Sequence, residues 1–160
     1  MKHTLSVLVK NHSGVLSHVA GMFSRRAFNI DSLTVGETIN PKISRMTIVV
    51  RGDDKVIEQV KKQLKKLIDV IELEDIVPGR AVMRELVLVA VKITDETRSK
   101  VIELADVFSA KALDMTENYI TFEIVGDDRR ISTFLNLMKK YGDLKIARTG
   151  LTALPLENCE

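Results

Sequence analysis

Residues 11–30 read NHSGVLSHVAGMFSRRAFNI, and this stretch decides how the beginning of the chain folds. A polar turn, Asn11 to Gly14, precedes apolar residues at helical spacing, which predicts one amphipathic helix. The stripe consists of Val15, Leu16, Val19, Ala20, Phe23 and Ala27. Ser13 is the predicted N-cap, because its hydroxyl can accept a hydrogen bond from the first turn. Asn29 then leads directly into a strand.

The segments around this stretch complete a pattern of six elements. Alternating or β-branched runs predict strands at 5–10, 30–38, 45–51 and 70–77, the last with Ile71 and Leu73 pointing inward. Gly52-Asp53-Asp54 ends the third strand and caps a second helix. The predicted buried stripe of that helix is Val56, Val60, Leu64 and Leu67. The order β-α-β-β-α-β is the ferredoxin-like signature of an α+β domain.

The second half of the chain repeats this order. A near-continuous apolar run predicts a strand at 86–93 that is buried on both faces. Thr94-Asp95-Glu96 caps the next helix, a hairpin turns about residues 117–118, and Gly126-Asp127-Asp128 precedes the last helix. We therefore predict tandem ferredoxin-like domains. Their predicted bounds are 1–77, a linker at 78–83, 84–150, and a polar C-terminal tail at 151–160.

The bulk composition excludes several classes of protein. The 160 residues are 45% hydrophobic and 29% charged with a net charge of +2, which gives no electrostatic footprint for nucleic acid or a membrane surface. The single cysteine, Cys159, cannot form an intrachain disulfide. No apolar run reaches the ~20 residues of a membrane span, and no signal-like region opens the chain. We expect a cytoplasmic protein.

The turn at residues 11–16 has the chemistry of an anion receptor. A helix N-terminus offers free N–H groups and the positive end of the helix dipole to a carboxylate. Gly14 lets a ligand approach the backbone, and Asn11 supplies both a donor and an acceptor. Val15 and Leu16 add apolar surface for a branched side chain. A glycine at a strand–helix junction is also ordinary turn chemistry, so the residues alone leave both interpretations open.

The same stretch carries a resemblance. Residues 11–16 with residues 23–35 and 44–47 resemble the ACT domain, an amino-acid-sensing module, in the form found in small regulatory subunits of acetolactate synthase. Residues 84–86 and 147–150 resemble the C-terminal domain of that family. The resemblance implies homodimers through paired ACT sheets, with valine bound between them. Its implied contacts are Asn11, Gly14, Val15 and Leu16 from one subunit and Asn29 and Ile30 from the other.

The resemblance also implies a partner and a division of labour. The chain would be non-catalytic, activate a large catalytic subunit and confer valine feedback inhibition in branched-chain amino-acid biosynthesis. Thiamine diphosphate, FAD and Mg are then expected in the large subunit and no cofactor in this chain. The second repeat replaces the glycine turn by the acidic residues 93–96, so we predict that it does not bind the amino acid in this way.

Three alternatives were weighed against this hypothesis. An independent enzyme is disfavoured because the spacing of His3, His12 and His18 fits no metal site and the carboxylate pairs lie at strand or cap positions. His12 and His18 are predicted to be exposed. RNA binding is disfavoured because the first and third strands contain no aromatic residue for base stacking. A free-standing ACT-type sensor of a different enzyme stays open.

Overall fold

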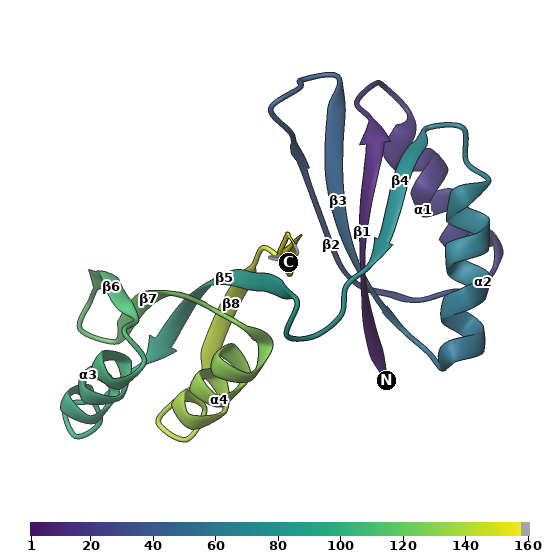
Figure 1. Ribbon diagram of the computed structural model, residues 1–160. Coiled ribbons are helices and arrows are strands. Elements are labelled where there is room, and N and C mark those ends of the chain that lie inside the picture. The colour runs from purple at the N-terminus through teal and green to yellow at the C-terminus, as the bar shows by residue number, and fades with distance from the viewer. Residues whose placement is uncertain (158–160) are drawn as a thin grey trace. The chain divides into compact units, whose positions relative to one another are not determined.

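A computed structural model describes residues 1–157, which form two compact units (Figure 1). The first unit holds residues 1–82 together with the segment that begins at Leu151, and the second holds residues 83–150. Both units contain the order β-α-β-β-α-β, so the predicted fold class is confirmed. Cys159 lies outside the described residues.

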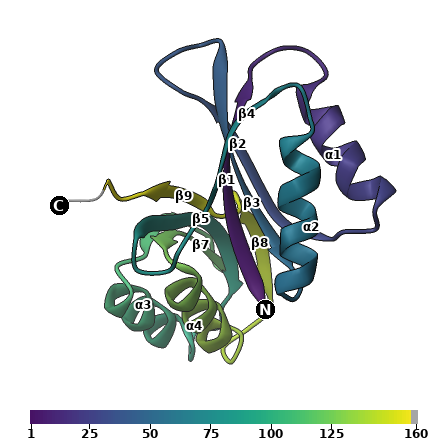
Figure 2. The same cartoon turned by 45° about the vertical axis from the view of Figure 1, so that its right-hand side comes forward.

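The first unit is a four-stranded antiparallel sheet with two helices on one face. Its elements are β1 (Lys2–Lys10), α1 (Val15–Arg25), β2 (Ile30–Glu37), β3 (Ile43–Arg51), α2 (Asp54–Lys65) and β4 (Val70–Asp75). The strand order is β2-β3-β1-β4, so β1 and β3 occupy the centre. Figure 2 shows α1 and α2 on the same side of these strands.

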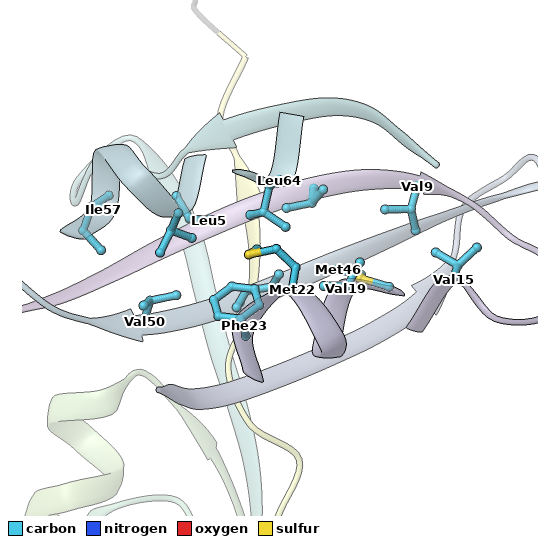
Figure 3. Packing of buried hydrophobic residues seen from close by; sticks show 13 residues of the cluster. Leu5, Val9, Val15, Val19, Met22, Phe23, Met46, Val50, Ile57 and Leu64 are labelled. Carbon is cyan, nitrogen blue, oxygen red and sulfur yellow. The ribbon is translucent and has the colours of Figure 1, made fainter. Parts of the chain in front are cut away.

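The core of the first unit lies between the helices and the two central strands. Figure 3 shows Met22 and Phe23 of α1 close to Leu64 of α2, above the apolar side chains of β1 and β3. Each fully buried side chain of this kind stabilises the fold by ~1.5–3 kcal/mol. Val60 and Leu64 of the predicted stripe of α2 are buried, and Val56 and Leu67 are half-buried against the core. Ile57, which the predicted stripe omits, is buried too.

The inward side of β4 differs from the prediction. Leu73 contacts the core as predicted, but Ile71 is half exposed and Val70 contacts the core in its place. The pairing of β4 with β1 shifts register between Leu8 and Val9. A bulge of this kind breaks the strict alternation of side chains, which is why residues at an odd separation face the same way.

The segment from Leu151 covers part of the face that carries no helix. Thr34 Oγ1 donates to Leu151 O at 2.9 Å, Leu151 N donates to Ser32 Oγ at 2.9 Å, and Ala153 N donates to Thr47 Oγ1 at 3.2 Å. Ala153 is 3% exposed. The expected polar tail is therefore wrong for residues 152–155, which form β9 (Thr152–Pro155). Four residues are too few to show periodicity, so the sequence pattern hid this strand.

The second unit repeats the architecture with its own core. Its elements are β5 (Ala81–Lys92), α3 (Arg98–Val107), β6 (Lys111–Met115), β7 (Tyr119–Gly126), α4 (Asp128–Met138) and β8 (Leu144–Arg148). The strand order along its sheet is β6-β7-β5-β8. The prediction that β5 is buried on both faces is wrong within this unit. Val87 and Val89 are fully buried, but Leu88 between them is 39% exposed, because the helices cover only one face.

Candidate effector site

The turn between β1 and α1 leaves the mouth of the helix open. Gly14 is the N-cap residue and has a left-handed backbone with φ +90°, a conformation that favours glycine. Within the described residues, no side chain caps this helix by a hydrogen bond, so the predicted N-cap role of Ser13 is wrong. A Cβ built on Gly14 would have no atom within 4 Å. A small anion therefore has room to approach the first-turn amides.

Asn11 is held by the β2–β3 hairpin. Its backbone N–H donates to Lys42 O at 2.8 Å, and its side-chain Nδ2 donates to Pro41 O at 2.9 Å and to Glu37 Oε1 at 3.3 Å. These bonds fix the position of the amide and use its donors. The side-chain carbonyl Oδ1 is an acceptor, the polarity that suits the ammonium group of an amino acid.

The two apolar residues of the predicted site differ in accessibility. Val15 is 4% exposed and belongs to the core of the first unit, whereas Leu16 is 50% exposed. Leu16 is therefore the side chain that can contact a ligand directly. Val15 anchors the first turn of α1 against the sheet.

Asn29 and Ile30 follow the C-terminal end of α1, where β2 begins. The helix contains 11 residues and is about 16 Å long at the usual rise per residue. Asn29 Nδ2 donates to Asp31 Oδ1 at 3.3 Å, and Ile30 is half-buried against the core. One chain thus separates the predicted residues into two half-sites, and their meeting across a dimer stays a prediction.

A cluster that the sequence analysis missed lies beside the turn at residues 11–16, which is called the effector turn below. Asp69, between α2 and β4, is 4% exposed, and its two carboxylate oxygens contact His12 Nε2 at 2.7 Å and His18 Nδ1 at 3.0 Å. The two histidines were expected to be surface residues. Both are more than half exposed, yet each has a ring nitrogen on the same buried carboxylate. Asp69 lies 57 residues from His12, so no local motif could have shown the contact.

The pKa values of His12 and Asp69 are both shifted toward the charged form of the side chain. The Ser13 carbonyl and the Asp69 carboxylate raise the pKa of His12. Hydrogen bonds from His18 and His12 lower the pKa of Asp69 against the opposing effect of its burial. The arrangement places an ion pair beside the turn at residues 11–16.

The corresponding turn of the second unit is held by hydrogen bonds of its own side chains, although α3, like α1, has no side-chain cap hydrogen bond. Thr94 N donates to Thr97 Oγ1 at 2.8 Å, and Thr97 N donates to Thr94 Oγ1 at 3.3 Å. Arg98 Nη1 donates to Asp95 Oδ1 at 3.1 Å across the same turn. These groups lie at residues 94–98, where the first unit has the left-handed Gly14.

Among residues 1–157 no group of three or more His, Cys, Asp or Glu side chains is arranged to hold a metal ion. Over the same range no helix combines the length and the apolar character required for crossing a bilayer.

Comparison with known proteins decides the family. Residues 5–72 match the model of the acetolactate synthase (AHAS) small subunit-like ACT domain, and residues 84–157 match that of the small subunit of acetolactate synthase. The chain is 49% identical over 154 residues to a probable acetolactate synthase small subunit of Archaeoglobus fulgidus, with 96% of each chain covered. The chain belongs to the acetolactate synthase small-subunit family.

Further members of the small-subunit family agree over the same length. The acetolactate synthase small subunit of Haemophilus influenzae is 40% identical, with 96% of this chain and 95% of the relative covered. The crystal structure of the Thermotoga maritima small subunit superposes with a TM-score of 0.87 at 40% identity and covers 99% of both chains. The predicted resemblance and the ACT nature of the first unit are confirmed.

Proposed function

We propose that this chain is a regulatory subunit that senses a branched-chain amino acid, valine first, and reports it to an acetolactate synthase large subunit. The observation that carries the proposal is the open helix mouth at Gly14, within a domain that matches the small-subunit ACT model. The valine carboxylate binds the amides at residues 14–16, and its ammonium group binds near Asn11 Oδ1. Leu16 contacts its side chain.

The second half of the pocket comes from a second copy of the chain. Asn29 and Ile30 lie about one helix length from Gly14, so they serve the site of the neighbouring subunit. Valine bridges two ACT domains and favours one dimer arrangement. A coupling free energy of ~1–3 kcal/mol is the usual size of such an effect. In the absence of valine the subunit activates the catalytic partner, which carries the thiamine diphosphate, FAD and Mg.

Replacement of Gly14 by Asp tests the proposal. A negative side chain at the helix mouth repels the carboxylate, so we expect Gly14→Asp to lose valine inhibition while still activating the large subunit. Acetolactate formation by the reconstituted complex, measured against valine concentration, is the assay. Inhibition at unchanged valine concentrations would contradict the site.

Gly79→Asp is the matched control for this experiment. Gly79 has the same left-handed backbone, with φ +85°, and equally open space around a built Cβ. Gly79→Asp therefore introduces the same backbone strain and the same negative charge as Gly14→Asp, but away from the helix mouth. We expect this variant to keep valine inhibition, which separates the effect of position from that of charge.

The large subunit distinguishes this proposal from a free-standing sensor of another enzyme. A complex of the two purified chains, detected by size-exclusion chromatography and by increased acetolactate synthesis, supports the regulatory subunit. If the two chains elute separately and the rate of acetolactate synthesis by the large subunit is unchanged, the free-standing sensor is favoured.

A further inference from the structure

The carboxylate of Asp69 connects three segments of the first unit. His12 belongs to the effector turn, His18 lies one turn into α1, and Asp69 precedes β4. Its own backbone is fixed too, because Lys10 N donates to Asp69 O at 2.9 Å. A buried carboxylate without partners is costly, so loss of either histidine contact disturbs this junction.

The hydrogen-bond geometry of His12 requires a proton on both ring nitrogens. Nδ1 faces the Ser13 carbonyl oxygen at 2.9 Å, and Nε2 faces Asp69 Oδ1 at 2.7 Å. Both partners are acceptors, and a neutral imidazole donates from only one nitrogen. The imidazolium satisfies both contacts. His18 differs, because its contact with Asp69 uses Nδ1 and is satisfied by one proton.

This cation stands in the loop that leads into the open helix mouth. His12 is two residues from Gly14, and its carbonyl oxygen accepts from Val15 N at 3.4 Å. A positive charge here adds to the helix dipole for any anion at residues 14–16.

We propose that Asp69 is a positioning residue of the effector turn, which through His12 holds a proton beside the place of the amino-acid carboxylate. This inference rests on the proposed function, and it makes effector affinity depend on pH. The groups that face His12 are Asp69, His18 on the same carboxylate, and Lys10 at the end of β1, whose charge opposes the proton.

The sign of the dependence follows from the raised pKa of His12. The proton is bound below that pKa and is lost as the pH rises through it. Valine binding is therefore strongest at the acidic end of the physiological range and weakens toward alkaline pH.

Isothermal titration of the full chain with valine between about pH 6 and about pH 8 tests this. We expect the wild-type Kd to rise by about twofold to fivefold across the range. In His12→Gln the rise disappears, and in Asp69→Asn it shrinks while the affinity at the acidic end falls. His3→Gln is the matched control, because it removes a histidine that pairs opposite Val50, at the other end of β1. An undiminished rise in His12→Gln overturns the proposal.

An NMR titration of the histidine side chains keeps the test independent of valine. The His12 midpoint should lie above its ordinary value in the wild type and move down in Asp69→Asn, and the amide signals of residues 11–16 should shift in the same variant. Identical midpoints in the two proteins overturn the inference. If the wild type gives no heat with valine at any pH, although the His12 midpoint moves as expected, the proposed function and the role of the cluster in effector binding are refuted. The contact of Asp69 with the effector turn is then still supported.

Discussion

The two units differ most where their first strand meets their first helix. In the first unit the turn ends at a left-handed Gly14 and presents an uncapped helix. In the second, Thr94 and Thr97 exchange hydrogen bonds and Asp95 pairs with Arg98. The frameworks that hold these turns have the same order of strands and helices. The turns thus differ in a left-handed glycine on one side and in threonine and acidic side chains on the other, although neither α1 nor α3 has a side-chain cap hydrogen bond.

The largest effects on stability are expected from substitutions in the hydrophobic cores of the two units. Phe23 and Phe134 each lie in a buried cluster, and Phe134 packs edge-on against both Phe108 and Phe122. Replacement of either by alanine should lower the free energy of unfolding of its unit by ~3–5 kcal/mol, as large-to-small core changes do. Denaturant unfolding measures this.

Valine binding then separates the two phenylalanine variants. Phe23 belongs to α1, whose first turn forms the proposed site, so we expect Phe23→Ala to weaken valine binding and Phe134→Ala to leave it unchanged. Equal losses in the two variants would contradict the assignment of the effector site to the first unit alone.

The helix caps that the units share should be equivalent. Asp53 Oδ1 accepts from Val56 N at 2.9 Å, and Asp127 Oδ1 accepts from Arg130 N at 2.8 Å. Asp53→Ala and Asp127→Ala should each cost ~1 kcal/mol, the usual loss on removal of a cap. Thermal unfolding checks this. A loss in only one variant would show that the resemblance of the two units stops at element order.

The smallest effects are expected at the turns themselves. Thr97→Ala removes the Thr97 hydroxyl, which accepts from Thr94 N, and should cost about 1 kcal/mol. Ser13→Ala should change stability by less than about 0.5 kcal/mol, because the Ser13 side chain does not cap α1. A loss at Ser13 as large as that at Thr97 would remove the contrast between an open and a closed turn.

The sequence predicted features that depend on local pattern. The alternating strands, the buried positions Val15, Val19 and Phe23 of α1 and the caps at Asp53 and Asp127 follow from residues close together in the chain. The other predicted members of the α1 stripe, Leu16, Ala20 and Ala27, are exposed, and Met22 is buried instead. Ser13 was misassigned as a cap, because the left-handed Gly14 takes the N-cap position that a serine would otherwise favour.

Features that depend on distant partners were beyond sequence reasoning. Asp69 meets His12 only because β1 and β4 are adjacent in the sheet. The register shift opposite Leu8 and Val9 brings Val70 inward in place of Ile71, and no glycine marks it. The proposed site has the same character, since Asn29 lies a helix length from Asn11 and needs a second copy of the chain.

The return of β9 to the first unit has a consequence for biosynthesis. Ser32, Thr34 and Thr47 find their partners in residues 151–153, which the ribosome adds only after all of residues 83–150. While the second unit is being synthesised, these hydroxyls are solvated, and the helix-free face of the first sheet lacks the cover of β9. A nascent chain arrested at residue 150 would therefore carry an ACT sheet that lacks this cover. Addition of residues 151–155 would provide it.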